Sequence, residues 1–123
     1  MRVLIVEPNE ELARIWAGFL QRQGATVKLV LTQKAAINAM RFQDFDVLVV
    51  EVVLPDGGAI SISDYAAYRH PNMPIIAVTD SSFFSNGTLF DLIPNARGMM
   101  RAPVRPEDLA AVLDHVNSLK RPA

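Results

Sequence analysis

The chain has 123 residues, half of them hydrophobic, and its 12 basic and 13 acidic side chains leave a formal net charge of −1. This length allows one domain with its own core, and the composition excludes a disordered chain. The near-neutral balance gives no reason to expect nucleic-acid or membrane-surface binding. No apolar run reaches the about 20 residues of a membrane-spanning helix. There is no cysteine, which excludes disulfides and thiol catalysis. We expect a cytoplasmic protein.

Five short runs predict β-strands. Three of them, at residues 3–6, 47–50 and 75–79, are continuously apolar and β-branched, as in strands that are buried on both faces. The run at 26–31 carries Lys28, which favours a place near the edge of the sheet. The run at 98–102 has the weakest pattern of the five.

Amphipathic helices alternate with these strands. The first is expected to begin after Asn9 and to end before Gly24, and the second to begin after Thr32 and reach about Arg41. The others are expected at residues 60–69, at 84–92 and from Pro106 onward, because proline suits the first position of a helix. The apolar stripe of the last helix is formed by Leu109, Val112, Leu113, Val116 and Leu119.

Strict alternation of strand and helix indicates right-handed βαβ crossovers and a parallel sheet covered on both faces. The predicted fold is a three-layer (βα)5 domain of the α/β class. We expect it to span residues 1–120, with a short tail at 121–123. In open parallel sheets, ligands bind beyond the carboxyl ends of the strands. Glu7 and Glu51 both end apolar strands, so their carboxylates should lie at the same edge, where they either form a site or are simply solvated.

Four segments resemble the receiver domain of two-component response regulators, in order and at the spacing of that family. They lie at residues 5–9, 49–58, 78–79 and 102–109, and the Leu54-Pro55-x-Gly loop is the most specific of them. The resemblance covers essentially the whole chain. It implies a flavodoxin-like fold with sheet order 2-1-3-4-5. It also implies a cis peptide bond between Ala102 and Pro103.

The resemblance further implies a phosphorylation site, which this chain has altered. A working receiver has two adjacent acids after the first strand, an Asp phosphoacceptor, a Thr or Ser, and a Lys before the last proline. The acids and the Asp hold Mg²⁺, and the metal and the Lys neutralise charge on the phosphoryl group. The equivalent positions here are Glu7 and Pro8, Glu51, Thr79, and Ala102 followed by Pro103. Met99 occupies the position of an aromatic residue that reports switching together with Thr79.

Each change weakens the usual chemistry in a different way. Pro8 offers no side-chain oxygen, so a metal ligand is missing. The extra methylene of Glu51 moves its carboxylate by more than about 1 Å, which an in-line displacement tolerates poorly. Ala102 removes the fixed cation. The sequence therefore predicts a degenerate receiver that is not phosphorylated in the usual way. It predicts no cofactor and weak or no Mg²⁺ binding, with Glu7 and Glu51 as the remaining oxygen ligands.

A stand-alone, non-enzymatic signalling module that acts by protein–protein contact is the leading hypothesis. The partner would be a histidine kinase, a phosphotransfer protein, another regulator or a second copy. A candidate partner surface is formed by Arg97, Met99, Arg101 and Arg105, with strand alternation placing the first three on one side; the alternative is an ordinary solvated rim. A phosphorelay receiver that still accepts a phosphoryl group is a second hypothesis. A small flavodoxin-like ligand-binding enzyme is the third, although no glycine-rich phosphate loop follows a strand.

Overall fold

A computed structural model describes residues 1–79, 93 and 95–119 of the chain. Within them, the main sheet is formed by β1 (Arg2–Val6), β2 (Thr26–Val30), β3 (Val47–Glu51), β6 (Ile75–Thr79) and β7 (Ala96–Arg101). A small hairpin is formed by β4 (Val53–Leu54) and β5 (Gly57–Gly58), and the helices are α1 (Glu10–Arg22), α2 (Gln33–Phe42), α3 (Ala59–Arg69) and α5 (Pro106–Ser118). The helix expected at 84–92 and the tail expected at 121–123 lie outside the described residues.

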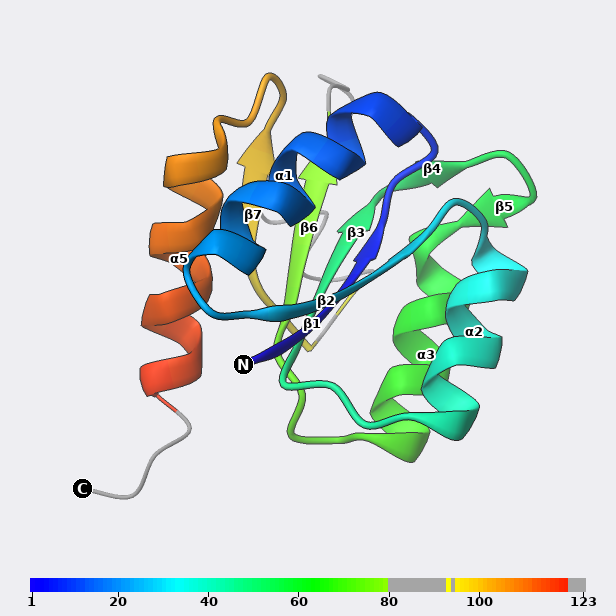
Figure 1. The fold of residues 1–123 in the computed structure, drawn as a ribbon. Helices are drawn as coiled ribbons and strands as arrows, with labels where there is room; N and C mark the ends of the chain where they lie inside the picture. Colours follow the sequence, from blue (N-terminus) through cyan, green and yellow to red (C-terminus); the bar gives the residue numbers. More distant parts are fainter. Residues whose placement is uncertain (80–92, 94, 120–123) are drawn as a thin grey trace.

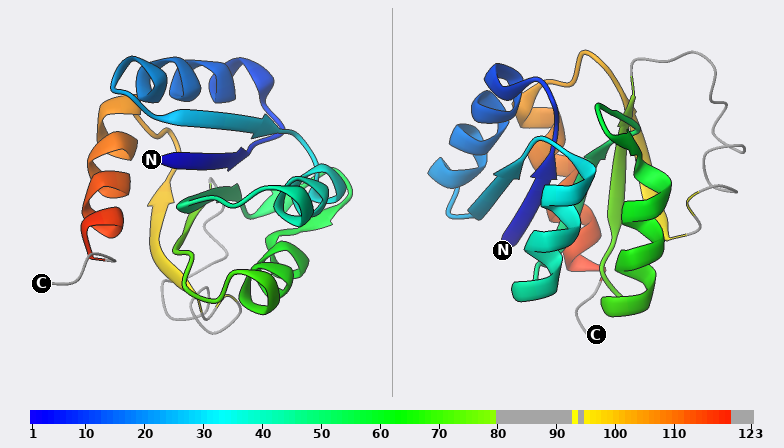
Figure 2. Two further views of the ribbon diagram at one scale, coloured as in Figure 1. Left: turned by 60° about the horizontal axis from the view of Figure 1, so that its bottom comes forward. Right: turned by 90° about the vertical axis from the view of Figure 1, so that its right-hand side faces the viewer.

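The five strands of the main sheet are parallel to their neighbours, in the order β2-β1-β3-β6-β7. Counted along the chain within this sheet, this is the predicted order 2-1-3-4-5. Helices α1 and α5 cover one face, and α2 and α3 lie side by side on the other (Figures 1 and 2). The three-layer α/β, flavodoxin-like prediction is confirmed. This arrangement brings the carboxyl ends of the parallel strands to one edge, where α/β folds bind their ligands.

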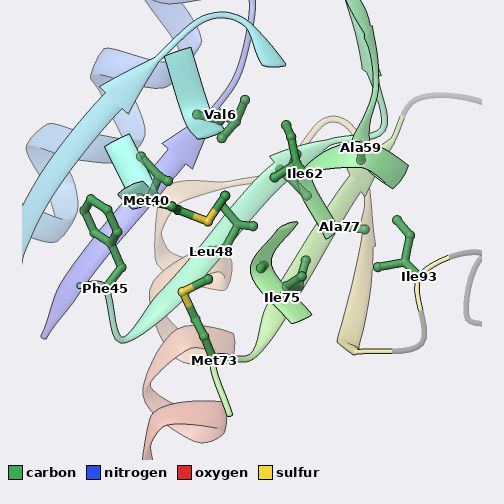
Figure 3. Close-up of a cluster of buried hydrophobic side chains, with 14 of the residues drawn as sticks. Val6, Met40, Phe45, Leu48, Ala59, Ile62, Met73, Ile75, Ala77 and Ile93 are labelled. Carbon is green, nitrogen blue, oxygen red and sulfur yellow. The ribbon is translucent and has the colours of Figure 1, made fainter. Parts of the chain in front are cut away.

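Two clusters of buried apolar side chains hold the layers together. Leu4 and Leu48 contribute to the cluster beneath α2 and α3 (Figure 3), whereas Val3 and Val47 contribute to the one beneath α1 and α5. Side chains of a strand alternate between the two faces, so a strand covered on both faces needs an apolar residue at each position. This requirement explains why the central strands are continuously apolar in the sequence.

The helix ends match the residues chosen as caps. The Asn9 side chain accepts a hydrogen bond from the Leu12 N–H at 3.2 Å, and the Thr32 hydroxyl accepts one from the Ala35 N–H at 3.1 Å. Each satisfies a donor that the first turn of a helix leaves without a backbone partner. Gly24 adopts a φ of 98° just after α1, a conformation that glycine reaches at little cost.

Three details differ from the sequence predictions. Strand β7 begins at Ala96, two residues before the expected start, and ends at Arg101. The segment after β3 was expected to be a loop but contains the antiparallel β4–β5 hairpin. Leu119 is exposed, because α5 ends at Ser118 and the chain leaves the core there. In the described part of the chain, no helix has the length and apolar character needed to cross a bilayer.

A long-range hydrogen bond ties α1 to the segment that leads into α5. Trp16 is almost completely buried, and its indole Nε1–H donates to the Val104 carbonyl at 2.9 Å. A buried carbonyl needs a partner, since water cannot reach it. The tryptophan therefore fills the core and also fixes the chain immediately after Pro103.

Candidate functional site

The site residues predicted from the sequence come together at the carboxyl edge of the main sheet. Glu7 follows β1, Glu51 ends β3, Thr79 ends β6, and Ala102 follows β7. The sheet register fixes their relation, because Val6 pairs with Val50 and each is followed directly by its glutamate. Glu7 and Glu51 therefore leave adjacent parallel strands at the same level. Parallel hydrogen bonding continues just beyond the strand ends. The backbone N–H groups of Val52 and Ala102 donate to the carbonyls of Val78 and Thr79, at 3.0 and 2.9 Å.

These polar side chains differ in their exposure. Glu7 is only 6% exposed and Thr79 is fully buried, whereas Glu51 is partly exposed. One carboxylate oxygen of Glu51, Oε1, accepts a long hydrogen bond of 3.4 Å from the backbone N–H of Val53. The longer side chain of glutamate thus bends back over the start of the β4–β5 hairpin.

The loop after β7 has the expected backbone conformation but no cation at the expected position. The peptide bond between Ala102 and Pro103 is cis, as the resemblance implied. The methyl group of Ala102 offers neither charge nor hydrogen bond. The adjacent cation, Arg101, is exposed and pairs in register with Thr79.

The oxygen-bearing side chains predicted at this edge are those of Glu7, Glu51 and Thr79. The backbone and ring of Pro8 stand where the second acid would be, so the side chain supplies no oxygen. Among the described residues, no three His, Cys, Asp or Glu side chains are grouped so that they could hold a metal ion. Glu7 and Glu51 are the two carboxylates that the sequence predicts at this edge.

A second feature of the edge, missed from the sequence, anchors the β4–β5 hairpin to α2. The carboxylate of Asp56 accepts hydrogen bonds from the backbone N–H groups of Gln33 and Lys34, at 2.8 and 3.1 Å. In return, the Gln33 side-chain amide donates to the Gly58 carbonyl at 3.3 Å. Gly57, with a φ of 146°, lies so close that a Cβ there would come within 2.8 Å of Gln33 Oε1. The sequence signal was the Asp-Gly turn, but nothing in it identified the distant helix as the partner.

Asp56 should make part of the stability depend on pH. The N–H groups of Gln33 and Lys34 lower the pKa of Asp56 below its ordinary value of 3.8. A depressed carboxyl pKa gives stability that is complete above the unfolded pKa and is lost as the pH falls through the folded one. We expect the free energy of unfolding of Asp56→Asn to fall less between about pH 5 and pH 3 than that of the wild type. Asp64→Asn on the exposed face of α3 is the control, and identical curves for Asp56→Asn and the wild type would contradict the prediction.

The four residues of the predicted partner surface do not share one side. A register shift between Ile75 and Ile76 places one extra residue in β7, and a bulge of this kind breaks strand alternation. Met99 packs against the cluster beneath α2 and α3, whereas Arg97 lines a hollow with Val116 and Leu119 on the α5 side. The expectation of a common side for Arg97, Met99 and Arg101 is therefore wrong.

Arg105, unlike Arg97 and Arg101 in β7, lies just before α5 and forms an ion pair with Glu107. Its guanidinium Nε–H donates to the carboxylate of Glu107 at 2.7 Å. Hydrogen bonding to Glu107 raises the pKa of Arg105, and Glu107 has a lowered pKa because of its own backbone N–H and then Arg105. Arg105 thus has a local counter-charge, which reduces its contribution to any positive surface.

The parallel sheet and its strand order define a flavodoxin-like α/β class of protein. A profile of the family described as the response regulator receiver domain matches residues 3–114. The chain belongs to this family, the receiver domain of two-component response regulators.

Relatives and solved structures agree with this assignment. The aerobic respiration control sensor protein ArcB of Escherichia coli (strain K12) is 28% identical over 82 residues, which are 64% of this chain and 10% of that protein. The non-phosphorylated HemR receiver domain of Leptospira biflexa has a TM-score of 0.85 and 26% identity, covering 99% of this chain and 98% of its own. A CheY-like response regulator receiver domain protein of Methanospirillum hungatei has a TM-score of 0.82 and 24% identity, covering 96% and 97%. The chain thus spans about a tenth of the length of the curated relative.

Proposed function

We propose that this receiver domain signals from the cytoplasm by protein–protein contact, as a non-enzymatic module, without the usual phosphorylation of an aspartate. The observation that carries the proposal is the composition of the carboxyl edge. Three of its positions, Pro8, Glu51 and Ala102, hold side chains that lack the usual chemistry. Thr79 keeps the family pattern.

The three changes act on different parts of the reaction. Phosphoryl transfer depends on positioning and on electrostatic stabilisation of charge that spreads over the phosphoryl oxygens. Pro8 removes a metal ligand and Ala102 removes a cation, so the charge of a transferring phosphoryl group would be poorly compensated. The Glu51 carboxylate, bent toward the Val53 N–H, is displaced from the position of a shorter aspartate. It instead supplies a permanent negative charge, although with fewer acceptor oxygens than a phosphoryl group.

The test is direct labelling. We expect acetyl phosphate with millimolar Mg²⁺ to leave no stable phosphate adduct, measured by intact-protein mass spectrometry. We also expect Mg²⁺ alone to leave the melting temperature unchanged, because ligand binding to the folded state would raise it. A working receiver labelled in parallel controls for the reagent. A Mg²⁺-dependent adduct on Glu51 would contradict the proposal and favour the phosphorelay hypothesis.

The partner is proposed to be a histidine kinase, a phosphotransfer protein, another regulator or a second copy. Arg97 lies on the α5 side of β7, whereas Met99 lies on the opposite side. Strand alternation puts Arg101 on the same side as Met99, so we retain these two residues as the partner surface. Arg pairs with carboxylates through its planar guanidinium while its stem packs on apolar surface, and Met adapts to irregular partners.

The two arginines of β7 should therefore differ in their effects. We expect Arg101→Ala to weaken binding of a histidine-kinase or phosphotransfer domain about three- to tenfold, measured by calorimetric titration. Arg97→Ala on the α5 side is the matched control and should leave the affinity unchanged. Each substitution should alter the free energy of unfolding by only about 0.5 kcal/mol. An affinity loss for Arg97→Ala alone would place the contact on the α5 side instead.

A further inference from the structure

The outer surface of α2 is hollowed along its length, from Thr32 near the carboxyl edge to Arg41 in the last turn of the helix. One shallow hollow of about 650 Å³ runs beside Lys34, Asn38 and Arg41. A second, of about 250 Å³, lies between α2 and the edge strand β2, with Lys28 and Phe42 in its lining. Ala35 and Asn38 line both hollows, so the two lie side by side. We call this surface the α2 trough; its defining residues are Lys28, Lys34, Ala35, Asn38, Arg41 and Phe42.

Charge is segregated at the α2 trough. The charged residues lining the two hollows are Lys28, Lys34 and Arg41, and neither lining contains an acid. This contrasts with the chain as a whole, whose net charge is −1. The nearby carboxylate of Asp56 already accepts the α2 backbone N–H groups of Gln33 and Lys34. The trough is therefore a cationic surface on a chain without excess positive charge.

The trough also exposes an aromatic side chain beside small apolar ones. Phe42 is 75% exposed, although it belongs to the last turn of a well-packed helix. Next to it, Val30, Ala35 and Ala39 line the hollow between α2 and β2. Alanine side chains leave room for a larger group to enter, and Phe42 would lose its contact with water if one did. An apolar patch with a charged rim is typical of a protein-binding surface.

The spacing of these residues suits a helix as the occupant. Lys34, Asn38 and Arg41 are separated by four and three residues, so they lie on one face of α2. At 1.5 Å per residue, Lys34 and Arg41 are about 10 Å apart along the axis. Carboxylates about seven residues apart on a facing helix would match them.

We propose that the α2 trough binds an acidic amphipathic helix of a partner protein. Its carboxylates pair with Lys34 and Arg41, and a bulky apolar side chain enters the hollow beside Phe42. Three cations and one aromatic on a chain of net charge −1 provide too little positive charge for a nucleic acid or a lipid surface. This surface is separate from Glu51 and from Arg101, so it stands whether or not the proposed function is correct.

The probe is a fluorescein-labelled synthetic peptide of about 18 residues, helical, with glutamate on one face and leucine on the other. We expect saturable binding by fluorescence anisotropy, with backbone NMR shifts confined mainly to residues 28–43. The double variant Lys34→Glu with Arg41→Glu should weaken binding at least about tenfold, and Phe42→Ala about threefold or more. Arg22→Glu is the matched control, because Arg22 also lies in the last turn of a helix, α1, and it should leave the affinity within about twofold.

Circular dichroism of each variant establishes that it is folded; if the charge reversal is not, Lys34→Gln with Arg41→Gln replaces it. Absence of saturable binding, or equal affinity for wild type and the double variant, would overturn the proposal. So would equal binding of a peptide with lysine in place of glutamate. Phosphatidylserine vesicles bound with the same dependence on Lys34 and Arg41 would assign the trough to a lipid surface instead. Self-association that the double variant abolishes, measured by sedimentation without peptide, would assign it to a second copy.

Discussion

Replacing Trp16 with alanine is expected to lower the free energy of unfolding by about 3–5 kcal/mol, a large part of the stability of a domain of this size. Two losses combine in this variant. Removal of the buried indole leaves a cavity between α1 and the sheet. The Val104 carbonyl also loses the Nε1–H that donates to it at 2.9 Å. Urea unfolding followed by far-ultraviolet circular dichroism measures the change, since the chain has only one tryptophan to report by fluorescence.

Two further variants separate the packing from the hydrogen bond. Trp16→Phe keeps an aromatic ring but leaves the Val104 carbonyl without its donor. We expect this variant to lower the free energy of unfolding by about 1–3 kcal/mol. Ile15→Ala, at the neighbouring and exposed position of α1, should change stability by about 0.5 kcal/mol. If Trp16→Phe were as stable as the wild type, the link between α1 and the segment after Pro103 would contribute nothing.

The fold was largely predictable because burial on both faces forces an apolar residue at nearly every position of a central strand. The runs at 3–6 and 47–50 satisfy this rule, and Asn9 and Thr32 have the side-chain oxygens that helix starts require. Strand β7 was harder to place. It lies at the edge of the sheet, so Arg97 and Arg101 can be solvated, and a residue inserted by the register shift obscures the alternation.

The carboxyl edge was predictable for a geometric reason, since parallel strands end at the same edge of the sheet. Glu7, Glu51, Thr79 and Ala102 could be placed together without any coordinates. The anchoring of Asp56 could not, because its partners are backbone N–H groups of Gln33 and Lys34, which carry no side-chain signal. The α2 trough was likewise hidden, because Lys28 and Lys34 lie on different elements, and only the fold places the hollows that they line side by side.

Restoring the altered edge is expected to create phosphate labelling where the wild type shows none. The triple variant Pro8→Asp, Glu51→Asp and Ala102→Lys returns an acid, a correctly placed acceptor and a fixed cation. The backbone beside position 102 is already held in place, because Ala102 donates its N–H to the Thr79 carbonyl. Labelling with acetyl phosphate and Mg²⁺, measured by intact-protein mass spectrometry, should give an adduct of one phosphate, which peptide mapping should locate at the substituted acceptor position.

The single variant Glu51→Asp tests whether the other two positions also matter. Loss of one preorganised electrostatic group typically costs about 100- to 1,000-fold in rate, and groups that act as a unit are strongly non-additive. Glu51→Asp alone should therefore remain unlabelled, because Pro8 and Ala102 still leave the phosphoryl charge uncompensated. Labelling of Glu51→Asp alone would show that acceptor length is the sole defect. A folded triple variant that stays unlabelled would instead place the loss of phosphorylation outside these three positions, contrary to the proposed function.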